Sequence, residues 1–270
     1  MSRILDQRLI WLSDSDARSL LGGRLLGLER EALRVAPDGY ISQVAHPAAL
    51  GSALTHPYIT TDYSEALLEF ITPPLATAAE VARFLDESHR FAYRHIGDEL
   101  LWSASMPCIL AGEASIPIAE YGRSNPGVMK HVYRRGLAWR YGRIMQVIAG
   151  IHFNFSLPDD FWAAFQESEG DRRSPQAFRS EAYFGLIRNL QRFGWLILYL
   201  FGASPAVCKS FLDGKATTLA EYDDHTCYGP FATSLRMSNL GYTNRTEKKS
   251  GVNVCYNSLA EYVALSLIHI

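Results

Sequence analysis

The stretch GLEREALRV, residues 27 to 35, decides the fold expected for this chain because it reads as a strand that places two glutamates among apolar residues. In a β-strand successive side chains point to opposite faces. Glu29, Glu31 and Leu33 would then share one face, and Arg30 and Arg34 the other. Two neighbouring carboxylates on a half-buried face need an arginine, a cation or open water to stay ionised. The stretch therefore indicates either a solvated strand or one wall of a cation site.

Composition bounds the class of protein. The chain has 270 residues, of which 48% are hydrophobic, and this predicts a soluble globular protein of one large or two small domains. Its 26 basic and 28 acidic residues give a net charge of -2. A nearly neutral chain has no overall field that would draw it to nucleic acid or to anionic lipid. We therefore expect small-molecule partners, with neither nucleic acid nor a membrane among them.

Two apolar segments need to be distinguished from targeting or membrane segments. The N-terminal MSRILDQRLIWLSDSD is interrupted by charges, unlike a secretory signal, so we expect a cytoplasmic protein. The longest uncharged run, FGWLILYLFGASPAVC at 193–208, is shorter than the roughly 20 residues that a membrane-spanning helix needs. We predict a buried helix and its exit turn there.

The four cysteines are widely and irregularly spaced, with no CxxC pair among them. This pattern fits neither a zinc site nor a disulfide-rich secreted scaffold. Buried free thiols are the prediction for Cys108, Cys208, Cys227 and Cys255.

Hydrophobic periodicity predicts strands interspersed with long helices. Helices are expected at 3–22, at 77–98 and, as one or two segments, at 175–202; strands are expected at 26–35, after the APDG turn at YISQV, at 59–73 and at 150–158. Short strands joined by turns favour an α+β domain with a largely antiparallel sheet.

Two further strands carry polar residues among apolar ones. In the strand predicted at 59–73, Glu65 and Glu69 would share a face, although their spacing of four residues also fits one face of a helix; the threonines, Phe70 and Ile71 favour a strand for the second half. In GIHFNFSL, His152 and Asn154 lie opposite the apolar face, although a lone strand histidine is commonly a hydrogen-bonded structural residue. If the three strands join one sheet, Glu29, Glu31, Glu69 and His152 would form an oxygen-rich cavity suited to Mg²⁺ or Mn²⁺.

Several common catalytic motifs are absent from the sequence. It contains no GxxxxGK[ST], GxGxxG, GxSxG or HExxH. The absence of these motifs leaves a metal-centred phosphate site as an alternative. The basic candidates for anionic groups, each of which could equally be an exposed charge, are Arg134, Arg135, Arg140, Arg236 and Arg245.

The chain resembles the bacterial type-1 glutamate–cysteine ligases in long collinear blocks. These blocks are GLEREALRV, HPAALGSALTHPYITTDYSEALLEFITP, SMPC, YGRSNPG, YRRGLAWRYG, GIHFNFSLP, YLFGASPAVC, ATSLRMSNLGYTN and SLAEYVALSL. Several long blocks in a fixed order make the resemblance specific.

The resemblance implies an ATP-dependent carboxylate–amine ligase with a glutamine synthetase-like catalytic architecture, in which a curved antiparallel sheet forms a funnel with helices packed behind it. ATP would phosphorylate the γ-carboxylate of L-glutamate, and the amine of L-cysteine would attack the acyl phosphate, as the first step of glutathione biosynthesis. Such phosphoryl transfer relies on divalent ions and basic groups, and needs no protein nucleophile.

The resemblance also implies roles for individual residues. The metal ligands, for Mg²⁺ or Mn²⁺, would be Glu29, Glu31, Glu69, His152 and Asp62. The amino-acid substrates would be held by Tyr133, Arg236 and Tyr242, with Gln146 as a further candidate.

Members of this family continue beyond the point where this sequence stops. We expect residues 1–265 to be the N-terminal portion of a single catalytic domain and residues 266–270 to be a tail outside the family, as in a truncated chain. The alternatives are a related ligase with another amine acceptor and an inactive fragment that only binds metal or substrate.

Overall fold

The computed structural model describes residues 3–241 and 255–269. The longer strands are β1 Leu25–Val35, β3 Leu67–Ile71 and β5 Ile151–Ser156, and the shorter ones are β2 Ile59–Thr61, β4 Leu100–Leu101, β6 Ala206–Cys208, β7 Ala220–Glu221 and β8 Thr226–Tyr228. The α-helices are α1 Arg3–Ser13, α2 Ser15–Leu20, α3 Ala78–Tyr93, α4 Asn125–Tyr141, α5 Asp159–Ser168, α6 Pro175–Phe193, α7 Trp195–Phe201, α8 Lys209–Leu212 and α10 Leu259–His269. The predicted α+β class is confirmed.

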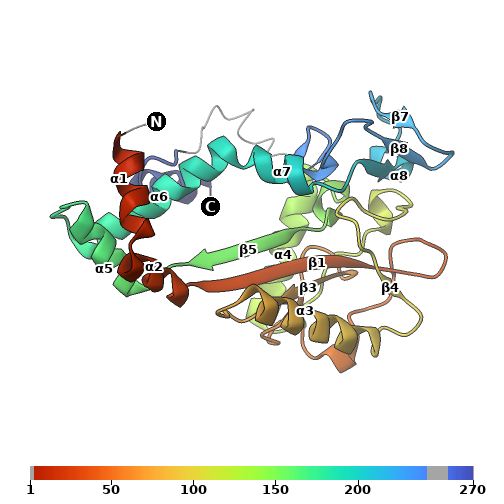
Figure 1. The fold of residues 1–270 in the computed structure, drawn as a ribbon. Coiled ribbons are helices and arrows are strands. Elements are labelled where there is room, and N and C mark those ends of the chain that lie inside the picture. The colour runs from red at the N-terminus through yellow and green to blue at the C-terminus, as the bar shows by residue number, and fades with distance from the viewer. Residues whose placement is uncertain (1–2, 242–254, 270) are drawn as a thin grey trace.

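β1 is the centre of the main sheet, and all of its pairings are antiparallel. The strand order is β2-β3-β1-β4, and β5 also pairs with β1. Figure 1 shows β1 and β5 side by side across the middle of the molecule, with α3 below them and α6 above. A second sheet of β6, β8 and β7 lies at the far end, beside α8.

The two faces of β1 enter different cores, as strand alternation requires. Leu33 continues the face that carries Glu31 into the largest core cluster, which also contains Leu67 and Val147. Ala32, on the other face, packs in a second cluster that α3 covers. Burial on both faces therefore fixes the register of this strand.

A buried ion pair lies on the α3 face of the sheet. Arg34 is fully buried and donates to Glu99 at 2.6 Å, and Ser42 donates to the second carboxylate oxygen. Arg34 also donates to the backbone carbonyls of Val44 and Glu65. These bonds tie β1 to the segment after it and to the turn between β2 and β3.

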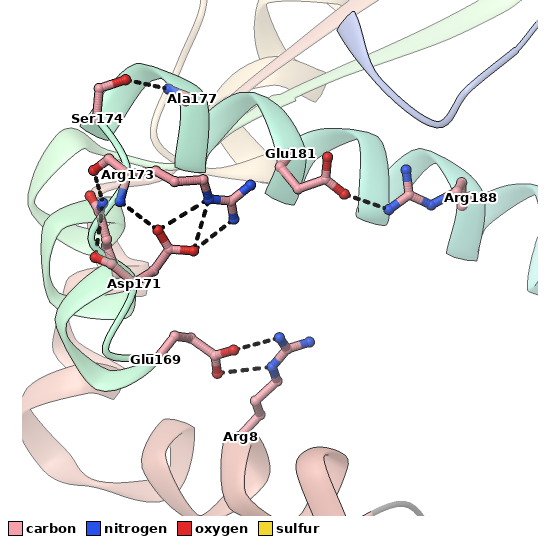
Figure 2. Close-up of polar contacts among 9 residues, drawn as sticks. Arg8, Glu169, Asp171, Arg173, Ser174, Ala177, Glu181 and Arg188 are labelled. Carbon is pink, nitrogen blue, oxygen red and sulfur yellow. Dashed lines mark hydrogen bonds and ion pairs between the residues drawn. The ribbon is translucent and has the colours of Figure 1, made fainter.

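At one end of the molecule, α1, α5 and α6 form a helical unit (Figure 2). Arg8 of α1 makes a bidentate pair with Glu169 at 3.0 and 2.6 Å, and Ser174 caps α6. Exposed ion pairs of this kind contribute only about 0 to 1 kcal/mol each. The packing of Trp11 against Phe161 therefore contributes more than the Arg8–Glu169 pair to holding α1 against α5.

Two predicted elements are each divided in two. The helix expected at 3–22 is broken at Asp14, whose side chain accepts from the backbone of Asp16 and caps α2. The strand expected in the second half of 59–73 is confirmed as β3, but one continuous strand is wrong: β2 and β3 form a hairpin in which the Ser64 hydroxyl accepts from the Ala66 amide in the turn. The return at YISQV is reduced to isolated bridges.

The hairpin corrects the position of Glu65. Its carboxylate accepts from the backbone amides of His46 and Glu120, both at 2.8 Å. Glu65 therefore fastens loops together and does not share a strand face with Glu69.

The helix predicted within 193–208 is present as α7, but its predicted burial is wrong. In α7, Tyr199 is 69% exposed and Phe201 is 77% exposed. An apolar run creates a preference for burial but does not supply the element that covers it. No described helix is long and apolar enough to cross a membrane.

All four cysteines are free thiols, as predicted. Cys108 and Cys227 are buried, but Cys208 and Cys255 are partly exposed, so their predicted burial is wrong.

Two glycines of α4 give a matched test of its packing. A Cβ on Gly127 would lie 2.4 Å from the carbonyl oxygen of Tyr121, whereas a Cβ on Gly136 meets nothing closer than the Arg140 side chain at 3.8 Å. We expect Gly127→Ala to lower the free energy of unfolding by about 1 to 3 kcal/mol through overpacking. Gly136→Ala should raise it by about 0.5 to 1 kcal/mol through helix propensity. Urea unfolding of both variants measures this, and equal effects would contradict the close approach.

Candidate metal and substrate site

Strand pairing gathers the acidic residues on one face of the sheet. Glu31 of β1 lies directly opposite Glu69 of β3, and Glu29 lies directly opposite His152 of β5. Opposed residues in an antiparallel pair have Cβ atoms about 4.5 to 5.5 Å apart, and like charges there repel. The three strands thus join as expected, and they bring Glu29, Glu31, Glu69 and His152 together.

Hydrogen bonds orient two of these carboxylates. Glu29 contacts His152 Nδ1 at 3.1 Å and accepts from the Asn154 amide at 2.8 Å. Glu31 accepts from the Gly150 backbone amide at 2.6 Å. If Nδ1 donates to Glu29, the lone pair of His152 lies on Nε2, which is 4.0 Å from Glu31. That nitrogen is then available to a cation.

Asp62 joins the cluster from the turn after β2. Burial raises the pKa of its carboxyl, and the nearby Arg134 guanidinium partly offsets that effect. Of the residues implied for the metal, all five therefore lie around one part of the sheet.

The carboxyl groups are held in an environment that disfavours their charge. Burial and then the charges of Asp62, Glu31 and Glu29 raise the pKa of Glu69 to about 7. Burial, followed by Asp62, also raises the pKa of Glu31. Desolvation and mutual repulsion are the effects that a divalent cation would relieve.

A cavity of about 400 Å³ opens beside the acidic cluster. Its lining comes from the middle of β1, the turn after β2, α4, the segment before β5, the start of β5 and the segment after β8: Glu31, Asp62, Tyr63, Tyr133, Arg134, Leu137, Gln146, Ile148, His152 and Arg236. The structure thus places the predicted substrate residues Tyr133, Gln146 and Arg236 at this cavity. Tyr242 and Arg245 lie outside the described residues.

Gly150 makes room for the groups around it. A Cβ at this position would lie 2.6 Å from Nη2 of Arg236, 3.0 Å from Nε2 of His152 and 3.4 Å from Glu31. The missing side chain lets a cation, an imidazole and a carboxylate approach the same backbone position. Arg236 is held there by a bond from Nε to the carbonyl of Ala149 at 3.2 Å.

The donor set fits a hard divalent cation, because carboxylate oxygens with one imidazole suit Mg²⁺ or Mn²⁺. As the side chains are placed, however, no group of three or more His, Cys, Asp or Glu within residues 3–241 and 255–269 closes around a metal position. Glu29 and Glu31 are engaged with protein donors instead. Binding of an ion would require these carboxylates to turn towards one another.

Sequence patterns missed some residues of the site. Tyr63 lines the cavity and is only 2% exposed, and its hydroxyl has no hydrogen-bond partner among the described residues. From the sequence alone Arg134 had the same weight as four other arginines, whereas in the structure Arg134 and Arg236 line the cavity. Its position directly after Asp62 in the sequence could have indicated that Tyr63 lies at the site. Nothing in the spacing distinguished Arg134 from the exposed Arg135.

The chain matches a known protein family over nearly its whole length. The family model described as glutamate–cysteine ligase matches residues 9–269. A glutamate–cysteine ligase of Alcanivorax borkumensis is 55% identical over 260 residues, which are 96% of this chain and 49% of that protein. One from Pseudomonas putida is also 55% identical, over 262 residues, covering 97% of this chain and 49% of that protein.

Solved structures agree with this relationship. The crystal structure of glutamate–cysteine ligase from Francisella tularensis in complex with AMP has a TM-score of 0.81 and 39% identity, covering 90% of this chain and 47% of that chain. A bifunctional glutathione synthetase from Pasteurella multocida has a TM-score of 0.79 and 33% identity, covering 97% of this chain and 32% of that one.

The matched family and the relatives that resemble this chain are enzymes named as ligases. The chain belongs to the glutamate–cysteine ligase family. It spans about half the length of the curated relatives it matches.

The raised pKa of Glu69 predicts how stability depends on pH without metal. The unfolded chain ionises this group near 4.5 and the folded chain near 7, so its contribution to stability is complete below pH 4.5 and is lost as pH rises through 7. We expect Glu69→Gln to raise the free energy of unfolding by about 1 to 2 kcal/mol at about pH 8, after allowing for solvent screening of this half-buried group, and to have little effect at about pH 5.

Urea unfolding in excess chelator at the two pH values measures this difference. The exposed Glu87 of α3 provides the control variant Glu87→Gln, which should have the same small effect at both. A destabilising effect of Glu69→Gln at the higher pH would contradict the unfavourable environment of Glu69.

Proposed function

We propose that this chain contributes the glutamate-binding and metal-binding side of an ATP-dependent ligase, which joins the γ-carboxylate of L-glutamate to the amine of L-cysteine through a γ-glutamyl phosphate. The observation that carries the proposal is the cavity that brings acidic and basic side chains together. Glu31, Asp62 and His152 line one part of it, and Arg134 and Arg236 line another. An amino-acid substrate and a metal-bound phosphate need both signs of charge.

Glu29, Glu31, Asp62, Glu69 and His152 would hold the divalent ions. When bound, Mg²⁺ or Mn²⁺ would supply positive charge that stabilises the negative charge of a transferring phosphoryl group. The protein's own part is to keep the carboxylates close and partly desolvated, so that binding the ion relieves their repulsion.

The other cavity residues would position the amino acids. Arg236 can offer Nη2 to a carboxylate, because its Nε is bound to the Ala149 carbonyl and its Nη1 donates to the Met237 sulfur at 3.7 Å. Tyr133 is 59% exposed and lies at the cavity, where its ring and hydroxyl can contact a substrate side chain. Gln146 is buried and can donate or accept a hydrogen bond there. Tyr242 stays a proposed substrate residue.

ATP use is supported by the structural neighbour from Francisella tularensis, whose crystal structure contains AMP. A place in the cytoplasm and in glutathione biosynthesis is part of the same proposal. The division into a family portion, 1–265, and a tail, 266–270, also stays a prediction.

The function is tested by phosphate release from ATP and Mg²⁺ with L-glutamate, with and without L-cysteine or 2-aminobutyrate. We expect release to require both amino acids. Equal rates with and without an acceptor amine would contradict ligation. Release with amines other than these two, but not with L-cysteine, would indicate the alternative of a related ligase. Metal and substrate binding without any release would indicate the alternative of an inactive fragment.

Metal binding is tested separately on a variant that preserves shape. Glu31→Gln can still accept the Gly150 amide bond but loses its charge, so we expect it to weaken Mn²⁺ binding by at least ~10-fold. Electron paramagnetic resonance of free Mn²⁺ measures this, with competition by Mg²⁺. Glu120→Gln removes an exposed carboxylate and is the control. Equal affinities of the two variants would remove Glu31 from the metal site.

A further inference from the structure

A second cavity, of about 340 Å³, lies where the C-terminal end of α4 meets α8. Among the described residues it shares no lining residue with the cavity beside the acidic cluster. Its volume falls in the range of about 300 to 1,000 Å³ that is common for small-molecule sites. Arg140, one of the five basic candidates from the sequence, lines this cavity and not the other one. The cavity is therefore a candidate for a separate ligand.

One wall of the second cavity is apolar and belongs to the main core. Ile144 and Phe211 are each 5% exposed and Leu212 is 7% exposed, and all three lie in the largest core cluster. Met145 packs against that cluster and also lines the cavity. Core packing fixes these side chains before a ligand arrives, which reduces the ordering cost of binding. The wall therefore favours an aliphatic or aromatic group.

Charges of both signs face the same cavity without pairing. Arg140 and Lys215 provide two cations, and Glu113 provides one carboxylate. For the side chains of all three, no ion pair and no hydrogen bond is found within residues 3–241 and 255–269. Opposite charges that do not neutralise each other match the two ends of a zwitterion.

The carboxylate of Glu113 lies against the end of α4. Gly142 caps this helix at a φ of 79°, and a Cβ on Gly142 would collide with Oε1 of Glu113. The C-terminal end of a helix carries partial negative charge, so a carboxylate is unfavourable there. An ammonium group in the cavity would offset the charge of Glu113 and of the helix end together.

We propose that this cavity is a second ligand site, which binds a free apolar amino acid as its zwitterion. The carboxylate of the ligand lies on Arg140 and Lys215, its ammonium group lies on Glu113, and its side chain packs on the wall of Ile144 and Phe211. The inference goes beyond the proposed function and does not rest on it, because none of these residues belongs to the metal and substrate site.

The two cavities are neighbours along the chain, so a test has to locate the ligand. Segments α4, 144–148 and 235–241 each contribute lining residues to both cavities. Met145 lines the second cavity, whereas Met237 contacts Arg236 of the first one, with its sulfur 3.7 Å from Nη1. The methyl groups of these two methionines therefore report on different sites.

Nuclear magnetic resonance of the full chain, labelled with methyl-¹³C methionine, measures binding of L-leucine as the probe. We expect a saturable shift of the Met145 signal, assigned with Met145→Leu, and no comparable shift of the Met237 signal. 3-Methylbutylamine is leucine without its carboxylate, and 4-methylpentanoate is leucine without its ammonium group. Each should bind ~10-fold or more weakly than L-leucine, because each loses a charge-assisted contact.

Charge-removing variants assign each contact. In Arg140→Gln/Lys215→Gln we expect the preference for L-leucine over 3-methylbutylamine to fall to less than about 2-fold, and the preference over 4-methylpentanoate to persist. Glu113→Gln should have the reverse effect. The control Arg123→Gln/Arg135→Gln removes two exposed charges that line neither cavity and should retain both preferences.

Four outcomes would overturn the inference. The first is that L-leucine does not shift the Met145 signal. The second is that it shifts Met237 instead, which would place it in the substrate cavity. The third is that both analogues bind as tightly as L-leucine, which would leave the apolar wall as the whole of the site. The fourth is that the charge-removing variants behave like their control. The signal of Met106, which is 2% exposed in the core, shows in each variant whether the fold is intact.

Discussion

The register of β1 against its neighbours is the constraint on which the site depends. Because Glu31 faces Glu69 and Glu29 faces His152, two strand pairings assemble the acidic cluster, and one of them joins residues more than 100 positions apart in the chain. A shift of one residue would turn Arg30 and its face towards the cavity and bury the carboxylates against α3. Burial of Leu33 and Ala32 in two cores stabilises the strand and offsets the repulsion between the opposed carboxylates.

The opposite face of the sheet stabilises the site indirectly. Replacing Glu99 alone would leave the Arg34 charge buried without its counter-ion, and losses of that kind commonly cost about 3 to 5 kcal/mol. Arg34 also holds the Glu65 carbonyl, and the Glu65 side chain fastens two loops. The turn that carries Asp62 is therefore held by Arg34 at the Glu65 carbonyl and by Arg134 and Tyr121 at the Asp62 carbonyl. Bonds to backbone carbonyls leave the carboxylate of Asp62 facing the cavity.

Apolar surface remains on the described residues away from the site. Ile151 and Phe153 alternate with His152 and are 64% and 63% exposed, because α3 covers β1 and β3 but not this part of the sheet. The residues of α7 are similarly exposed. This is where reasoning from composition failed, since apolar content predicts burial without naming the partner surface. The same limit applies to Cys208, which was expected in the core and is partly exposed.

The sequence by itself determined the alternation of β1, the presence of a helix within 77–98, and the class of the fold, because these depend on hydrophobic periodicity. It also indicated that Glu29 and Glu31 share a face. Only the tertiary structure decided that 59–73 forms a hairpin, that Glu65 fastens loops, and that Arg134 enters the cavity while Arg135 does not. These outcomes depend on contacts between distant segments, which no local pattern encodes.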